Sequence, residues 1–267
     1  MSLDFDADRP VVGMVHLAPL PGAPGYDDGD RAPARDAALR DLRRLDAGGV
    51  DAVMVENFGD APFYADDVPK HVVASMTALV SDLRRETDLP LGVNVLRNDA
   101  EAAVSIAAAA GADFVRVNVH AGARLTDQGV VEGKAAETVR LRDRLDAADV
   151  SILADVDVKH SAALAERPLS EGVAELLERG HADGVVASGA GTGHETDRDH
   201  LRAVVDARDD LGVDAPVFVG SGVTRESVEE TLTLADGAIV GTALKAGGKT
   251  TAPVDEDRVR ALVDAAR

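Results

Sequence analysis

The sequence contains no cysteine among its 267 residues. This absence excludes disulfide bonds, thiolate nucleophiles and thiolate metal ligands. Tryptophan is also missing, and aromatic residues make up only 3% of the chain. The core must therefore be aliphatic and built mainly from Val, Leu, Ile and Ala.

Long hydrophobic runs are lacking as well. No uninterrupted apolar stretch approaches the roughly 18 residues that a membrane-spanning helix requires. The first ten residues, MSLDFDADRP, are acidic and lack the basic start of a signal peptide. We therefore expect a cytoplasmic protein without membrane insertion.

Positive charge is scarce, because the net charge is -20 and lysine occurs only at Lys70, Lys134, Lys159, Lys245 and Lys249. Such acidity argues against a nucleic-acid partner and against binding to an anionic membrane surface. Abundant Asp with little Lys is similar to the composition of proteins from salt-loving microbes. Because the Debye length shrinks to about 3 Å at 1 M salt, self-repulsion is then screened. We predict a halophilic, haloarchaeal-like acidic protein.

Short apolar runs alternate with longer segments rich in Ala, Leu, Arg and Asp. The apolar runs predict strands near 11–17, 51–56, 91–96, 113–120, 151–158, 183–188, 216–220 and 237–241. Eight consecutive βα units favour a closed barrel over an open sheet. The length is close to the roughly 250 residues typical of this fold. We therefore predict an α/β protein, a single (β/α)8 TIM barrel over residues 1–267.

Polar residues occupy one face of several predicted strands. In DFVRVNVH, Arg116, Asn118 and His120 alternate with valines. In LADVDVKH, Asp155 and Lys159 share a face with Asp157. Because side chains alternate between the two faces of a strand, the valines are expected to meet the helices while the polar residues point into the barrel.

Three further strands end in polar residues, at His16, Glu56 and Asn94. The alternative is a buried ion-pair network, for example Arg116 with Asp155, that fills the barrel and has no role in binding or catalysis. Five strands with polar carboxyl ends favour function, because that end carries the active sites of such barrels. The predicted catalytic set is His16, Glu56, Asn94, Arg116, Asn118, His120, Asp155 and Lys159.

The residue types suggest roles for this set. His16, His120 and His160 are candidate general acids or bases. Lys159 is a candidate Schiff-base amine or charge stabiliser, and the alternative is a salt bridge to the flanking aspartates.

Cofactor signals are weak. Glu56, His120, Asp155 and Asp157 are weak candidate ligands for a divalent metal such as Mg, Mn or Zn. No HxH or HExxH spacing supports a metal site. The glycine cluster GAGTG in the sixth loop does not match a dinucleotide fingerprint, so there is no nucleotide cofactor signature.

Glycine-rich turns follow the seventh and eighth predicted strands, in VGSGVT and VGTALK. Turns at these two strands form the phosphate site of many barrels, and the alternative is an ordinary tight turn. The sixth loop, SGAGTGHETD, is also rich in glycine. The predicted phosphate- and substrate-binding residues are Asn57, Arg97, Ser188, Gly189, Thr192, Gly193, Gly220, Ser221, Gly222, Gly241 and Thr242.

Long stretches of the sequence resemble the BtpA family. They are GMVHLAPLPGAPGY, VENFGDAPFY, GVNVLRNDA, ADFVRVNVHAGA, TDQGVVEGKAAET, ILADVDVKH and VGSGVT with DGAIVGTALK. The resemblance covers about residues 10–265 in unbroken order. The sequence departs from the family pattern at two places. The sixth loop reads ASGAGTG rather than a form closer to SGxATG, and Asp157 stands where His is frequent, which weakens an acid–base role at that position.

The resemblance implies a (β/α)8 barrel, related to barrels that bind ribulose phosphates. Members of the family are named for photosystem I biogenesis or described as membrane-complex biogenesis proteins, and others resemble products of sugar-utilisation genes. Because family labels do not determine chemistry, three hypotheses stay open.

The first hypothesis is an enzyme, an isomerase, aldolase/lyase or hydrolase, that acts on a small phosphorylated metabolite such as a sugar phosphate. The second is a non-catalytic biogenesis or stability factor for membrane complexes, which needs an exposed docking patch. The third is a regulator that binds a phosphorylated metabolite and lacks turnover. The sequence leaves the substrate undetermined and a homo-oligomer possible.

Overall fold

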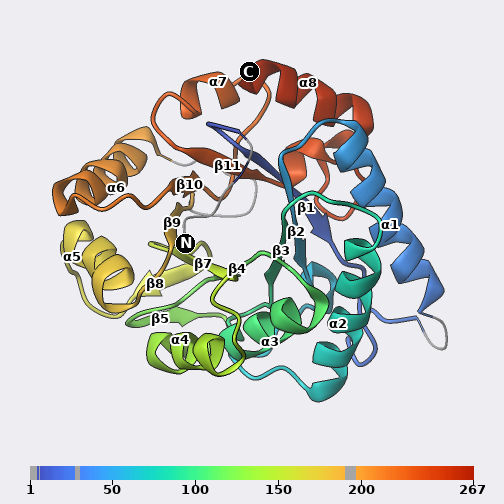
Figure 1. Cartoon of the computed structure of the whole chain (residues 1–267), viewed down its shortest axis with the longest axis horizontal. Coiled ribbons are helices and arrows are strands. Elements are labelled where there is room, and N and C mark those ends of the chain that lie inside the picture. The colour runs from blue at the N-terminus through green and yellow to red at the C-terminus, as the bar shows by residue number, and fades with distance from the viewer. Residues whose placement is uncertain (1–4, 6, 28–30, 190–196) are drawn as a thin grey trace.

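A computed structural model describes residues 5, 7–27, 31–189 and 197–267. Eight parallel strands close into a barrel in the order β1-β11-β10-β9-β7-β4-β3-β2 (Figure 1). Their bounds are β1 Val11–His16, β2 Ala52–Glu56, β3 Leu91–Asn94, β4 Phe114–Val117, β7 Ser151–Asp155, β9 Gly184–Ala187, β10 Val217–Val219 and β11 Gly237–Val240. Each strand lies within one of the eight predicted ranges, and the predicted barrel is confirmed.

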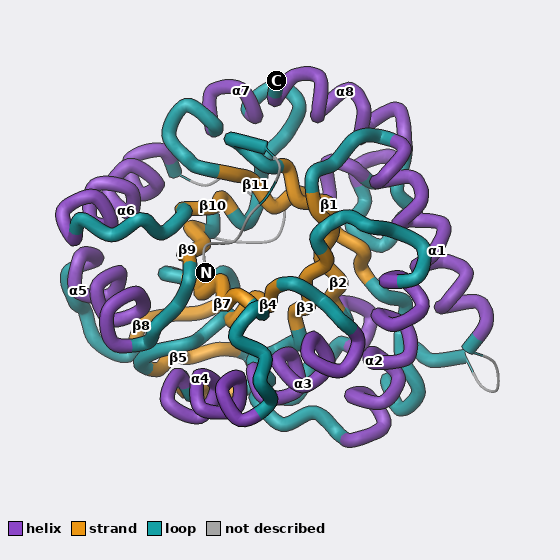
Figure 2. Tube along the Cα trace, in the orientation of Figure 1, coloured by secondary structure: helices purple, strands orange, loops and turns teal. Residues whose placement is uncertain are grey.

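Helices surround the barrel as an outer ring, with the strands inside (Figure 2). They are α1 Ala32–Ala47, α2 Lys70–Arg84, α3 Ala100–Ala110, α4 Ala135–Arg144, α5 Leu169–Ala174, α6 Arg198–Leu211, α7 Val228–Thr231 and α8 Glu256–Ala266. A π-helical turn, Glu175–Arg179, extends α5, and short 3-10 turns occupy Phe58–Asp60, Thr242–Leu244 and Ala246–Gly248. Outward strand residues such as Val15 and Val115 belong to the buried aliphatic core. Among the described residues, none of the helices combines the length and apolar character needed to cross a membrane.

The side chains inside the barrel form layers, because every second residue of each strand points inward. The middle layer is apolar and contains Met14, Met54, Phe114, Leu153, Val186, Phe218 and Ile239. Two residues further along each strand stand His16, Glu56, Asn94, Arg116, Asp155, Ser188, Gly220 and Gly241. The apolar layer thus forms the floor beneath a polar layer at the carboxyl ends of the strands.

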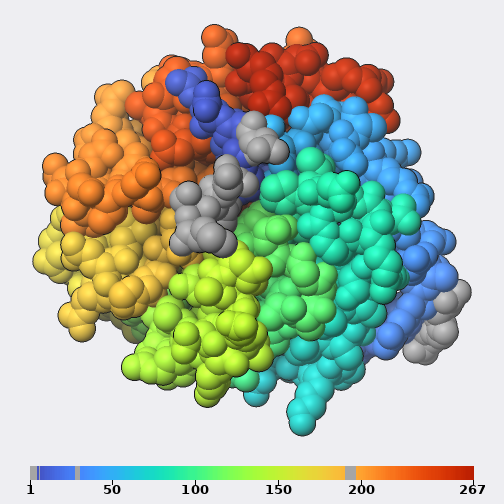
Figure 3. Space-filling view, viewed as in Figure 1, coloured from blue at the N-terminus to red at the C-terminus, as the bar shows by residue number. Residues whose placement is uncertain are grey.

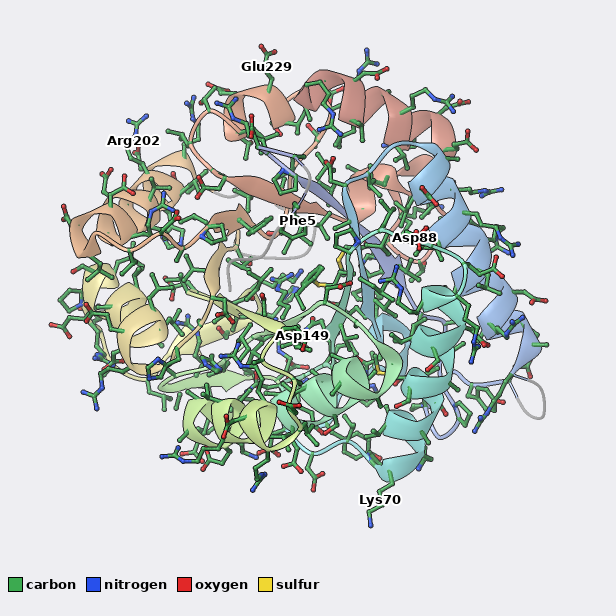
Figure 4. The ribbon with its side chains drawn as sticks, viewed as in Figure 1. Phe5, Lys70, Asp88, Asp149, Arg202 and Glu229 are labelled. Atoms are coloured by element: carbon green, nitrogen blue, oxygen red, sulfur yellow. The ribbon has the colours of Figure 1, made fainter. Side chains whose placement is uncertain are left out.

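Three phenylalanines fill the amino-terminal half of the barrel. Phe5 contacts Phe114 and Phe218 edge-on, with ring centroids 5.9 and 5.7 Å apart. Figure 4 labels Phe5 near the centre of the barrel. Figure 3 shows the residues of this face closely packed around the blue N-terminal segment. The rings need space, because a Cβ on Gly92 would lie 2.2 Å from Phe114 and one on Gly237 would lie 2.4 Å from Phe218.

Four aspartates brace the same end of the barrel. Asp51, Asp113, Asp183 and Asp236 each precede a strand and accept the backbone N–H of a neighbouring strand at 2.7–2.8 Å. Each also pairs with an arginine, at 2.6–3.2 Å: Arg267, Arg84, Arg142 and Arg208 respectively. These aspartates thus connect the first residues of the strands to arginines of the surrounding helices and the C-terminus.

Two predicted strands end earlier than expected, β4 at Val117 and β7 at Asp155. The loops that follow them build a second, antiparallel sheet of β6 Gly129–Glu132, β5 Ala123–Thr126 and β8 Ser161–Ala163. The segment 120–133 between β4 and α4 therefore contains a β-hairpin. A tight turn at Gly129, where φ is +99°, closes the β5–β6 hairpin.

Candidate active site

A cavity of about 580 Å³ opens at the carboxyl ends of the strands, the opposite end of the barrel from Phe5. Four of the predicted catalytic residues line it: His16, Glu56, Arg116 and Lys159. Five of the predicted phosphate-binding residues line the same cavity: Gly220, Ser221, Gly222, Gly241 and Thr242. The fold therefore joins the two sets of residues that the sequence analysis derived separately.

A buried ion pair anchors one wall of this cavity. Arg116 donates to both carboxylate oxygens of Asp155, at 2.7 and 2.9 Å, and to the hydroxyl of Ser188 at 3.2 Å. Asn118 donates to Asp155 at 3.2 Å, and Asn94 donates to Asn118 at 3.2 Å. The buried Arg116–Asp155 ion pair, considered in the sequence analysis as the alternative to a functional role, is thus present. It holds the Arg116 guanidinium at the cavity wall.

His16 lies on the floor of the cavity beside the ring of Phe58, with centroids 5.0 Å apart. Its Nε2 atom is 3.8 Å from Oε1 of Glu56, and its Nδ1 atom is buried without a hydrogen-bond partner among the described residues. Burial lowers the pKa of His16 to about 3, and the positive charges of Lys245 and Lys159 act in the same direction. His16 is therefore a neutral imidazole near pH 7.

Glu56 and Lys159 both line the cavity, and the charge of each affects the pKa of the other. Burial raises the pKa of the Glu56 carboxyl, although the charges of Lys159 and Arg116 oppose this shift. Burial also lowers the pKa of the Lys159 amine, and Arg116 adds to that effect. The two shifts have opposite directions, and each favours the neutral form of its group.

The predicted salt bridge from Lys159 to its flanking aspartates is not formed. Asp155 is held by Arg116, and Asp157 accepts a 2.6 Å hydrogen bond from Arg124. Within the part of the chain that the structure describes, no carboxylate lies at salt-bridge distance from the Lys159 amine.

The glycine turns lie beside the polar side chains of this layer. A Cβ on Gly220 would lie 2.9 Å from Nη2 of Arg116, and one on Gly241 would lie 2.8 Å from Cε1 of His16. Gly222 has a φ of +75°, which disfavours any residue with a side chain. These positions are glycine because the backbone must approach the polar layer closely and turn sharply.

The sequence matches the BtpA family over residues 7–267. The chain belongs to this family. An uncharacterized protein of Thermococcus kodakarensis is 46% identical over 99% of this chain and 97% of the relative. The photosystem I biogenesis protein BtpA of Synechocystis sp. is 41% identical over 98% and 89% of the two chains. The putative sgc region protein SgcQ of Escherichia coli is 33% identical over 96% and 94%.

Solved structures with low sequence identity share the fold of this BtpA-family chain. A native KDPGal structure has a TM-score of 0.58 at 17% identity and covers 99% of this chain and 97% of its own. The N-(5'-phosphoribosyl)anthranilate isomerase of Pyrococcus furiosus has a TM-score of 0.57 at 14% identity, with coverage of 97% and 98%. These likenesses agree with the predicted (β/α)8 barrel, and at such identities they concern the fold alone.

His120 of this BtpA-family protein does not face the barrel interior, and that prediction is wrong. The residue is fully buried, and its Nε2 atom lies 2.9 Å from the carbonyl oxygen of Gly180. The alternation still holds at Asn118, which donates to Asp155 just past the end of β4 at Val117, but it does not extend to position 120. Burial lowers the pKa of His120, away from the cavity.

Asn57 and Arg97 lie in loops at the same end but do not line the cavity. Asn57 accepts the N–H of Leu96 at 2.7 Å and donates to Asp60 at 3.2 Å, so it joins two loops. Arg97 donates to the backbone oxygen of Lys159. Both residues position their neighbours, and the predicted direct contact with a ligand is not supported by this placement.

A second cavity of about 350 Å³ adjoins the first at Lys159, which lines both. Ser188, Gly189, Asp157 and His160 line the second cavity. Thr192 and Gly193, also predicted to bind substrate, lie outside the described residues. The predicted substrate-binding residues Ser188 and Gly189, which follow β9, thus line this neighbouring cavity and not the first one.

The weak candidate metal ligands do not come together. Asp155 is committed to Arg116, Asp157 pairs with Arg124, and His120 points toward Gly180. Among the described residues, no group of three or more His, Cys, Asp or Glu side chains is arranged to hold a metal ion. The residues present therefore do not fit the metal site considered in the sequence analysis.

The sequence analysis missed Arg225 and Arg258 at the outer end of the larger cavity. Nε of Arg258 donates to the carbonyl oxygen of Ala243 at 2.8 Å, directly after the second glycine turn. Arg225 follows the first glycine turn at once in VGSGVTR, and this adjacency is the signal that was available in the sequence.

Proposed function

We propose that this BtpA-family barrel is an enzyme that performs acid–base chemistry on a small phosphorylated metabolite such as a sugar phosphate. The observation that carries the proposal is that one cavity is lined by both the glycine turns and the residues His16, Glu56 and Lys159. A ligand anchored at the turns would extend over these three side chains.

The phosphate is assigned to the turns at Gly220–Gly222 and Gly241–Thr242. Backbone N–H groups of such turns bind phosphate oxygens, and barrels commonly use the loops after their last two strands for this purpose. Arg225 and Arg258 line the same cavity, together with Glu226, Asp255 and Asp257, so the backbone N–H groups of the turns rather than a surplus of positive charge carry this assignment. The name of the Pyrococcus furiosus isomerase includes a phosphoribosyl group, which is compatible with this assignment on the same fold.

The acid–base work is assigned to Glu56, and substrate orientation to His16. A carboxyl group with a raised pKa holds its proton more readily than a free carboxyl group and can act as a general acid, and a neutral imidazole can orient a substrate oxygen by a hydrogen bond. Arg116, fixed by Asp155, supplies a positive charge for an oxyanion that forms during the reaction. Asn94 and Asn118 position this pair and are not assigned a proton-transfer role.

A thermal-shift screen with sugar phosphates and nucleotides, with and without divalent metal, tests the proposal. A ligand at 100 times its dissociation constant stabilises the folded state by about 2.7 kcal/mol, which is readily measured. The matched variants are Thr242→Asp and Thr242→Asn, because only the first adds a negative charge beside the second turn. We expect stabilisation in the wild type and in Thr242→Asn, and its loss in Thr242→Asp. No shift with any phosphorylated ligand would overturn the phosphate assignment.

Turnover of the ligand identified in this screen distinguishes an enzyme from a metabolite-binding regulator. Glu56→Gln keeps the shape of the side chain and removes its proton chemistry. Lost turnover with retained binding would support the enzyme, whereas binding without any turnover in the wild type would favour a regulator.

A second candidate function is a biogenesis or stability factor for membrane complexes. The name of the Synechocystis relative suggests it, and exposed apolar side chains on or beside the small second sheet are compatible with it: Leu125, Val130 and Leu164, each at least 50% exposed. A variant with Leu125 and Val130 changed to Ser would keep phosphometabolite turnover if the enzyme proposal is right. In a docking factor it would instead abolish assembly while the cavity variants left assembly intact.

A further inference from the structure

Lys159 follows two aspartates in the sequence, Asp155 and Asp157, and both carboxylates have other partners in the structure. Both oxygens of Asp155 accept from Arg116, and Oδ2 also accepts from Asn118 at 3.2 Å. Asp157 pairs with Arg124 and lies 4.0 Å from Nε2 of His200. The two carboxylates that would neutralise a structural lysine are therefore committed to arginines.

The backbone at Lys159 is held while its side chain borders open space. The Arg97 guanidinium donates to the Lys159 carbonyl oxygen, which fixes this part of the loop after β7. The side chain lies where the cavities of about 580 and 350 Å³ meet. A ligand that occupies either cavity would meet the amine.

Burial favours the neutral amine, which is the nucleophilic form, because it lowers the pKa of Lys159. The charges of Arg116 and Arg97 act in the same direction, and those of Glu56 and Asp155 oppose them. Burial also raises the pKa of the Glu56 carboxyl. A lysine placed next to other cations in a desolvated pocket is the usual arrangement of an amine that attacks carbonyl groups.

We infer that Lys159 forms a covalent imine with the substrate, and that the substrate is a phosphorylated ketone or aldehyde whose carbon–carbon bond is broken or made. This inference rests on the proposed function for the phosphate end of the ligand. It goes further in naming a carbonyl carbon, a covalent intermediate and the class of bond that reacts.

The first step forms a C–N bond. The neutral Nζ atom attacks the carbonyl carbon, and the amine proton moves to the former carbonyl oxygen to give a carbinolamine. Glu56, in its protonated form, then donates a proton to that hydroxyl group. Water leaves and a positively charged iminium group remains on Lys159.

The iminium group then accepts an electron pair from the adjacent carbon–carbon bond. In the cleavage direction, the Glu56 carboxylate left by the loss of water takes the proton of the hydroxyl group on the departing fragment as that fragment becomes an aldehyde. The electrons of the broken bond form an enamine on Lys159. Protonation of the enamine and addition of water then restore the free lysine and release the second fragment.

The test is reductive trapping of the full-length protein with dihydroxyacetone phosphate and sodium borohydride, followed by intact mass and peptide mapping. Reduction of the imine adds the mass of the ketone less one oxygen atom. We expect the adduct in the peptide that contains Lys159, with labelling about tenfold above that of exposed lysines. Lys70 is the matched control, because it is exposed at the start of α2 and points away from the barrel in Figure 4.

Two conservative variants complete the test, Lys159→Arg and Lys70→Arg, since arginine keeps the charge and cannot form the imine. Loss of the adduct in Lys159→Arg but not in Lys70→Arg supports the inference. Absence of an adduct in the wild type, or its persistence in Lys159→Arg, overturns the inference.

A parallel thermal-shift titration with inorganic phosphate keeps the two proposals distinguishable. If phosphate stabilises the protein but no adduct forms, the imine inference fails while the phosphate assignment stands. If dihydroxyacetone without phosphate labels Lys159 and phosphate has no effect, the inference stands and the phosphate assignment fails.

Discussion

The two ends of the barrel use their charged residues in opposite ways. At the amino-terminal end, four aspartates are each satisfied by a backbone N–H and an arginine. At the carboxyl-terminal end, His16 and Glu56 approach each other only to 3.8 Å, and the Lys159 amine has no carboxylate partner among the described residues.

This difference separates stability from reactivity. Charges that are paired and hydrogen-bonded stabilise a structure, whereas buried charges without partners cost stability and have shifted pKa values. Barrels generally place function at the carboxyl-terminal face and stability at the other. The Arg116–Asp155 pair is the exception at the reactive end, since it is fully satisfied and buried there.

The largest expected effect on the free energy of unfolding comes from breaking the Arg116–Asp155 pair. Asp155→Ala leaves the buried Arg116 guanidinium without its counter-charge, and such a change costs about 3–5 kcal/mol of the free energy of unfolding. Urea denaturation measures the loss. The matched control is Asp157→Ala, which removes a more exposed pair with Arg124 and should cost about 1 kcal/mol or less. Equal losses in the two variants would contradict the account.

A smaller loss is expected at the braced end. Asp183→Ala removes the acceptor for the backbone N–H of Ile152 at 2.7 Å and for Arg142 at 2.6 Å. Leaving this backbone group unsatisfied should cost about 1–3 kcal/mol in the same urea experiment. Binding of phosphate at the other end should be unchanged in this variant. A weakened phosphate affinity without any loss of stability would reverse the assigned roles of the two ends.

His16 should make stability depend on pH. Because its folded pKa of about 3 lies below the ordinary value of 6.5, the unfolded chain binds the proton more readily between these values. Stability from this group is complete above about pH 6.5 and falls toward pH 3, with a slope of up to about 1.4 kcal/mol per pH unit. His16→Gln should remove this component. NMR titration should find the wild-type His16 ring neutral down to about pH 3, and a midpoint near 6.5 would refute the prediction.

The smallest effect on stability is expected at Lys159. Lys159→Met removes a desolvated amine that has no carboxylate partner among the described residues, so the free energy of unfolding should stay the same or rise by about 1 kcal/mol. The imine adduct should disappear in the same variant. A loss of several kcal/mol on urea denaturation would mean that Lys159 holds the fold together rather than serving the cavity.

Much of this arrangement is accessible from the sequence. The βα alternation predicts all eight barrel strands, and the polar ends of strands identify His16, Glu56, Arg116 and Lys159 as residues of one cavity. These predictions hold because a two-residue period relates each polar residue to an apolar one beneath it, as Phe114 lies beneath Arg116.

The rest depends on contacts that no local pattern encodes. The period still holds at Asn118, just past the end of β4 at Val117, but it fails at His120, which lies against Gly180. The role of Asp183 is equally hidden, since an Asp before a strand resembles any turn residue until its partners Ile152 and Arg142 are brought near. Strand ends and long-range partners are set by tertiary packing.

The most direct test of the central claim is an NMR titration of the backbone amides with inorganic phosphate. The account predicts concentration-dependent shifts for the amides of Gly220, Gly222, Gly241 and Thr242, and unchanged amides for Leu91 and Ile152 at the braced end. Unchanged amides at both glycine turns, or equal shifts at the two ends, would contradict the assignment of the anion site to the reactive end of the barrel.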